Sequence, residues 1–161
     1  MKKASFSSFR GTVTDIRMAG SEENRCLLLY RIENEEGSLA EFLIAPDTYF
    51  LNQARIEIGM PVIGFYDVYA PMVLSFPPRY RPLAVAVDDH RHNMKLDYFD
   101  RNLKSMDGEL KLNIGPDTRV SMTNGQNFYG DPAGMLLLVL YGITTRSIPA
   151  QTTPEEIIVF C

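Results

Sequence analysis

The chain has 161 residues, enough for one medium-sized domain or two small ones with a buried core. Hydrophobic residues make up 45% of it and charged residues 22%, as in ordinary soluble globular proteins. The formal net charge is −4, and the parts before and after residue 88 each carry two more acidic than basic residues. Because proteins that bind duplex DNA normally carry a clustered basic surface, this charge pattern argues against that class.

The sequence also argues against an exported or membrane-spanning protein. No apolar segment of a secretory signal follows the first lysines, and no stretch approaches the roughly 20 apolar residues of a membrane span. Cys26 lies in a leucine-rich run that predicts burial, and Cys161 is the last residue, so neither a disulfide framework nor zinc-ligand spacing is indicated. We therefore expect a cytoplasmic protein with no membrane partner and no cofactor.

Alternating and apolar runs predict strands along the whole chain, and helical periodicity is almost absent. In the first part, the predicted strands are 9–16, 26–33, 38–44, 61–69 and 82–87. The segment 48–58 is ambiguous between a short helix and a strand. In the second part, the predicted strands are 94–99, a short one around Leu103, 108–114, 135–141 and 156–160. Asp107-Gly108 and Asn124-Gly125 are favourable turns between strands.

One pattern occurs twice in the chain. The run IAPDT at 44–48 returns as IGPDT at 114–118, a shift of 70 residues. Three further features match in the same order, namely Gly59-Met60 with Gly134-Met135, Pro77 with Pro149, and Pro82 with Pro154. We interpret the pattern as an internal duplication. Proline suits a type I turn, and Asp and Thr can bond nearby backbone amides, so the repeated run predicts a structural corner.

Five strands per copy resemble the OB-fold, a small Greek-key barrel. The predicted fold is therefore all-β, with two tandem OB-like barrels at 1–88 and 94–161 and a linker at 89–93. The sequence is also similar to bacterial modules of OB type that share a DT corner followed by I-x-x-G-x-x-V, here Ile56, Gly59 and Val62. In the second copy, a polar loop at 127–131 takes the place of the I-x-x-G run. The resemblance implies a fold and assigns no activity.

Catalytic motifs are missing from the sequence. It has no G-x-S-x-G elbow, no G-x-G-x-x-G run and no Walker sequence, so we expect a protein that is not an enzyme. The one cluster with ligand character is Asp88, Asp89, His90 and His92, which could hold a metal ion for hydrolytic chemistry. A solvated linker between the two copies is the simpler interpretation of the same residues.

Strand alternation predicts which residues face outward on the first copy. If Tyr30, Ile32 and Phe42 point inward, the outer face of the second and third strands carries Leu27, Leu29, Arg31 and Glu41. That face has one arginine and no stacking ring. The loop after the first strand is acidic. Both features disfavour the binding of single-stranded nucleic acid.

Two proline-rich loops without acidic residues, at 69–82 and 143–154, occupy equivalent places in the two copies and are called the fourth loops below. Their candidate partner-binding residues are Tyr69, Phe76, Arg79, Tyr80, Arg81 and Arg146. Proline limits the disorder that a loop loses on docking, and Tyr and Arg are enriched at interface hot spots. We expect docking of a protein partner or self-association through these loops. Internal packing of the loops, or binding of single-stranded nucleic acid or another anionic ligand by Arg79, Tyr80, Arg81 and Arg146, are the alternatives.

Overall fold

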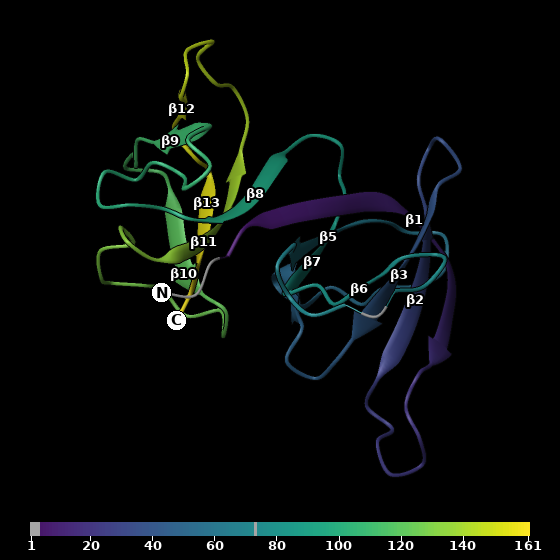
Figure 1. The fold of residues 1–161 in the computed structure, drawn as a ribbon. Helices are drawn as coiled ribbons and strands as arrows, with labels where there is room; N and C mark the ends of the chain where they lie inside the picture. Colours follow the sequence, from purple (N-terminus) through teal and green to yellow (C-terminus); the bar gives the residue numbers. More distant parts are fainter. Residues whose placement is uncertain (1–3, 73) are drawn as a thin grey trace. The chain divides into compact units, whose positions relative to one another are not determined.

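The computed structural model describes residues 4–72 and 74–161, and within them the regular structure consists of strands and one short 3-10 helix (Figure 1). The all-β prediction is confirmed. Two compact units divide the chain, Met1–Asp89 and His90–Cys161. The predicted linker at 89–93 overlaps the first strand of the second unit, which begins at Asn93. No helix in the described ranges has the length and hydrophobicity that a membrane span requires.

The first unit contains one seven-stranded sheet in the order β4-β7-β5-β1-β2-β3-β6. Its strands are β1 Phe6–Met18, β2 Leu28–Glu33, β3 Leu39–Ile44, β4 Tyr49–Phe50, β5 Pro61–Asp67, β6 Arg79–Tyr80 and β7 Ala84–Val87. The pairs β3–β6 and β4–β7 are parallel, and the other neighbours are antiparallel. The ambiguous segment 48–58 forms the short β4 and the 3-10 turn Leu51–Gln53.

The second unit contains a four-stranded sheet, β10-β13-β11-β8, and a two-stranded parallel pair, β12-β9. Its strands are β8 Asn93–Tyr98, β9 Leu110–Leu112, β10 Arg119–Met122, β11 Leu136–Tyr141, β12 Ala150–Thr152 and β13 Glu156–Phe160. The strand predicted around Leu103 is wrong, because isolated bridges stand there, Phe99 with Ser105 and Lys104 with Lys111. Among the described residues of both units, no sheet is closed into a barrel.

The pairings of the second unit repeat those of the first. Parallel β9–β12 corresponds to β3–β6, and parallel β10–β13 corresponds to β4–β7. Antiparallel β11–β13 and β8–β11 correspond to β5–β7 and β1–β5. The same four contacts therefore arise twice from segments about half the chain apart.

The two PDT turns have the same hydrogen bonds. The Thr48 amide donates to the Ala45 carbonyl and the Ala45 amide donates to the Thr48 hydroxyl, both at 3.0 Å. Thr118 and Gly115 exchange the corresponding bonds at 3.2 and 3.1 Å. The prediction of a structural corner is confirmed, and threonine makes these bonds in both copies.

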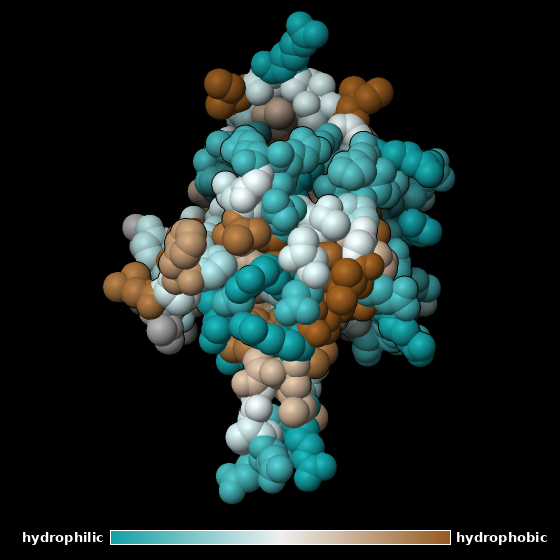
Figure 2. Space-filling view, turned by 90° about the vertical axis from the view of Figure 1, so that its right-hand side faces the viewer, coloured by the Kyte–Doolittle hydropathy of each residue, from teal (hydrophilic) through white to brown (hydrophobic). Residues whose placement is uncertain are grey.

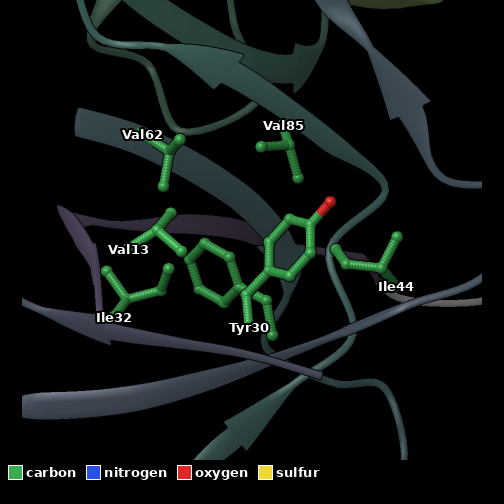
Figure 3. Packing of buried hydrophobic residues seen from close by; sticks show 7 residues of the cluster. Val13, Tyr30, Ile32, Ile44, Val62 and Val85 are labelled. Atoms are coloured by element: carbon green, nitrogen blue, oxygen red, sulfur yellow. The ribbon is translucent and has the colours of Figure 1, made fainter. Parts of the chain in front are cut away.

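Each unit has its own hydrophobic core. In the first unit, side chains from β1, β2, β3, β5 and β7 meet between the strands (Figure 3), namely Val13, Tyr30, Ile32, Phe42, Ile44, Val62 and Val85. Tyr30, Ile32 and Phe42 thus point inward, as the alternation argument assumed. In the second unit, the corresponding cluster is Phe99, Leu110, Leu112, Leu137, Val139, Ile157 and Val159.

Candidate functional site

The fourth loops carry some of the most exposed hydrophobic residues of the described chain. Phe76, between β5 and β6, and Ile148, between β11 and β12, each have 94% of their surface exposed. Leu74 and Ile143, in the same two loops, are exposed to a similar degree. In the face shown in Figure 2, hydrophobic groups are separated by polar ones, and two of them protrude at the top, where the β11–β12 loop lies.

The two exposed residues stand in the same local structure. Phe76 lies between Ser75 and Pro77, and Ile148 lies between Ser147 and Pro149. Each serine hydroxyl donates to the carbonyl of the proline two residues later, at 3.0 Å in the first loop and 2.8 Å in the second. Both prolines follow cis peptide bonds. The apolar side chain is therefore presented from a hydrogen-bonded turn in each unit.

The structure divides the predicted site residues into two groups. Tyr69, Phe76 and Arg146 are exposed. Tyr80 is half-buried, and its ring stacks on that of Tyr66 with centroids 4.0 Å apart. Burial raises the pKa of the Tyr80 hydroxyl, and a hydrogen bond with Tyr66 raises it further. Tyr80 thus belongs to the edge of the core.

The other two predicted residues form ion pairs within the first unit. Arg81 lies 3.7 Å from Asp47, the aspartate of the first PDT turn. Arg79 lies 3.3 Å from Glu41 in β3. The two arginines therefore pair with different carboxylates of the first unit.

Glu41 is the centre of a larger group, called the arginine cluster below and made of Arg17, Arg31, Arg79 and Glu41. Nη2 of Arg17 and Nη2 of Arg31 lie 3.3 and 3.5 Å from Oε2 of Glu41. Nη2 of Arg79 lies 3.3 Å from Oε1. The Glu41 side chain is only 5% exposed. A buried carboxylate needs such partners, because its desolvation is otherwise costly.

On β2 and β3 Arg31 is the single arginine of this outer face, as predicted, but neighbouring strands add two more. Arg17 comes from β1 and Arg79 from β6, and both join Arg31 on the same side of the sheet. A register shift in β1 between Val13 and Asp15 changes the alternation along that strand. The predicted strand 9–16 also ends before Arg17, so this contribution of β1 was missed.

A cavity of about 190 Å³ lies beside the arginine cluster. It is lined by Leu43, Tyr66, Asp67, Ala70, Pro71, Met72, Arg79, Tyr80 and Arg81. Apolar and aromatic groups form most of this set. The Asp67 carboxylate accepts hydrogen bonds from the backbone amides of Ser5 and Tyr69.

The alternative metal-site residues have other contacts. Asp88 is buried and lies 3.6 Å from a terminal nitrogen of Arg10. His92 bonds to Glu155, while Asp89 and His90 are exposed. Within the ranges that the structure describes, no group of three or more His, Cys, Asp or Glu side chains could hold a metal ion.

Cys26 is exposed, so its predicted burial is wrong. The leucine-rich run enters the sheet only at Leu28, where β2 begins, and Cys26 lies in the turn before it. An exposed thiol at this place is not packed among leucines.

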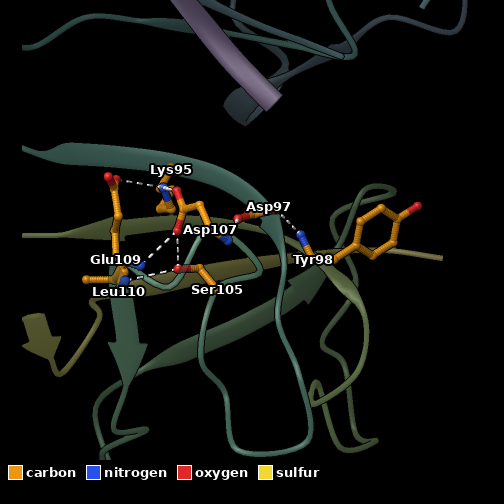
Figure 4. A network of polar contacts seen from close by, with 7 residues as sticks. All are labelled: Lys95, Asp97, Tyr98, Ser105, Asp107, Glu109 and Leu110. Carbon is orange, nitrogen blue, oxygen red and sulfur yellow. Dashed lines mark hydrogen bonds and ion pairs between the residues drawn. The ribbon is translucent and has the colours of Figure 1, made fainter. Parts of the chain in front are cut away.

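A polar network in the second unit links β8 to the Asp107-Gly108 turn (Figure 4). Lys95 bonds to Asp107, whose carboxylate also accepts from the Ser105 hydroxyl and the Glu109 amide. Asp97 accepts hydrogen bonds from the amides of Tyr98 and Asp107. These contacts hold the predicted turn on the neighbouring strand.

Comparisons of the chain with protein-family models, with curated proteins and with solved structures find no match.

Proposed function

We propose that the chain is a protein-interaction module of two tandem OB-like units, which docks a protein partner or a second copy of itself through the fourth loops. The observation that carries this proposal is the equivalent placement of Phe76 and Ile148, both 94% exposed. Exposed apolar residues contribute to association because docking removes them from water. Loops held by internal hydrogen bonds lose less conformational entropy on docking.

The strand pairings support the OB-like architecture. In the first unit, β6 and β7 follow each other with only three residues between them. The first pairs with β3 and the second with β5, so one segment reaches from one side of the sheet to the other. If β6 and β7 are counted as one strand, they make five strands together with β1, β2, β3 and β5, which is the number in a small Greek-key barrel. In the second unit, β12 and β13 make the corresponding pairs with β9 and β11.

Single-stranded nucleic acid binding through the fourth loops has less support. The Tyr80 ring already stacks on Tyr66, and Arg81 pairs with Asp47. A base could stack on the Tyr80 face that Tyr66 covers only after the two tyrosines separate. Arg146 remains as an exposed cation on the second loop.

The proposal is tested with the double variant Phe76→Ser/Ile148→Ser. Its matched control is Ile58→Ser/Tyr129→Ser, which removes one exposed hydrophobic residue from each unit outside the fourth loops. Sedimentation velocity over a range of concentrations measures self-association, and cross-linking in cells followed by mass spectrometry measures partner capture. We expect the loop variant to lose the association that the wild-type protein and the control retain. Equal association of all three proteins, or no association of the wild type by either method, would overturn the proposal.

A further inference from the structure

We propose that the arginine cluster on the outer face of β1, β2, β3 and β6 binds a phosphate group, with Glu41 positioning the guanidinium groups for it. The site lies on the sheet of the first unit. It shares Arg79 with the first of the fourth loops, but its test does not depend on the docking proposed for Phe76 and Ile148. Its ligand chemistry is a phosphate oxyanion that accepts several hydrogen bonds.

Strand register brings the arginines together. Arg31 in β2 pairs directly with Glu41 in β3, and Glu41 pairs directly with Arg79 in β6. Three neighbouring strands therefore place these side chains at one level of the sheet. Arg17 in β1 pairs with Leu29, two residues before Arg31, and it reaches Glu41 diagonally. The convergence is built by the backbone pairing of four strands.

The charged side chains at this level of the sheet favour the binding of an anion. Three guanidinium groups share the single Glu41 carboxylate. Asp15 also lies opposite Arg31 in the β1–β2 ladder. With Asp15 included, three positive and two negative side chains leave a formal surplus of one positive charge. Each arginine contacts Glu41 through one terminal nitrogen, whereas a guanidinium carries five N–H groups, so donors remain for a further acceptor.

The arginine side chains of the cluster are much more exposed than the carboxylate that they share. The side chains of Arg17, Arg31 and Arg79 are 56%, 41% and 42% exposed, whereas that of Glu41 is 5% exposed. An anion arriving from solvent therefore meets guanidinium groups before it meets the carboxylate. Planar guanidinium groups match the oxygens of phosphate with paired, charge-assisted hydrogen bonds. Since Glu41 already restricts the three arginines, binding orders fewer side-chain rotamers.

The test follows the side-chain Nε–Hε signals of the arginines by NMR while inorganic phosphate is added at constant ionic strength. We expect saturable shifts at Arg17, Arg31 and Arg79. Arg17→Gln is the chosen variant, because Arg17 is the most exposed of the three and Glu41 keeps two partners without it. The phosphate Kd should rise about tenfold in this variant, as expected for loss of a charge-assisted hydrogen bond. Arg55→Gln, an exposed arginine of the same unit outside the cluster, should leave it unchanged.

Unsaturable or absent shifts at the three arginines would overturn the proposal, as would equal losses in the two variants. A second arm replaces phosphate with a short single-stranded oligothymidylate. Tighter binding of the oligonucleotide at the same arginines would identify a nucleic-acid backbone as the source of the phosphate group. Binding of inorganic phosphate alone would identify a small phosphate-bearing ligand.

Discussion

Gly64 in β5 lies directly against the buried ring of Phe42 in β3, and a Cβ atom added to Gly64 would come 2.6 Å from Cε2 and 2.7 Å from Cζ of that ring. The ring has little room to withdraw, because Phe42 is fully buried and meets Phe9 edge-on with centroids 6.4 Å apart. In the core of the first unit, the backbone of β5 at Gly64 therefore packs directly on the Phe42 ring of β3, with no other side chain between them.

The change Gly64→Ala should lower the free energy of unfolding by about 1–3 kcal/mol, as overpacking of a filled core does. Urea-induced unfolding monitored by circular dichroism measures the loss. Gly142→Ala is the matched control, because no atom lies within 4 Å of its added Cβ. Equal stability of the two variants would contradict the close packing of Gly64 on Phe42.

The PDT turns give a comparison within one molecule. The hydroxyl of Thr48 accepts from the Ala45 amide, whereas the hydroxyl of Thr118 accepts from Gly115 and also donates to the Pro154 carbonyl at 2.7 Å. We expect Thr118→Ala to cost about 1 kcal/mol more than Thr48→Ala, the typical value of one further hydrogen bond. Thermal and urea unfolding check the difference. Thr118→Ser keeps the hydroxyl and should recover most of the loss, while a larger loss at Thr48 would refute the expectation.

Two carboxylates of the first unit pair with arginines at very different depths. Glu41 is 5% exposed in its side chain and Asp47 is 82% exposed. Glu41→Gln removes the charge that three arginines share, so we expect a loss of about 1–2 kcal/mol, moderated because the arginines are half-exposed. Asp47→Asn should change the free energy of unfolding by less than about 0.5 kcal/mol, as for a surface pair. Urea unfolding of both variants distinguishes the two cases. If Glu41→Gln left the free energy of unfolding unchanged, the cluster would add no stability.

Local sequence patterns predicted much of the fold. The strands β2, β3, β5, β8, β11 and β13 come from runs long enough to show alternation or continuous hydrophobicity. The strands β6, β10 and β12 were missed, because each has two to four residues and is defined by a parallel partner far along the chain. No local pattern contains that information.

The site was predictable to the extent that it depends on composition. The acid-free, proline-rich character of the fourth loops pointed to Phe76. Ile148 was missed, although it precedes Pro149, the match of Pro77 in the repeat. The arginine cluster was not predictable, because it joins four strands by register and one of them contains a bulge. Tyr80 was assigned to the surface because its ring stack with Tyr66 depends on the same tertiary contacts.

The polar network of the second unit predicts opposite pH responses at two neighbouring aspartates (Figure 4). Burial raises the pKa of Asp97 above its ordinary value of 3.8, and the Asp107 charge adds to this, although backbone amides oppose it. Burial would also raise the pKa of Asp107, but hydrogen bonds from Lys95, Ser105 and a backbone amide outweigh it and lower that pKa below 3.8.

The signs follow from proton linkage. The folded state binds a proton at Asp97 more tightly than the unfolded chain does, so Asp97 stabilises the fold as the pH falls from its raised pKa towards 3.8. The stabilisation from Asp107 is present above 3.8 and is lost as the pH falls through its lowered pKa. As the pH falls from the raised pKa of Asp97 towards 3.8, the free energy of unfolding of Asp97→Asn should therefore decrease relative to that of the wild type. As the pH falls from 3.8 through the lowered pKa of Asp107, the difference in the free energy of unfolding between Asp107→Asn and the wild type should shrink. Urea unfolding of the three proteins between about pH 2 and pH 7 measures both trends. If the free energies of unfolding of the two variants changed with pH in the same way, the burial of Asp97 and the hydrogen bonding of Asp107 described here would be wrong.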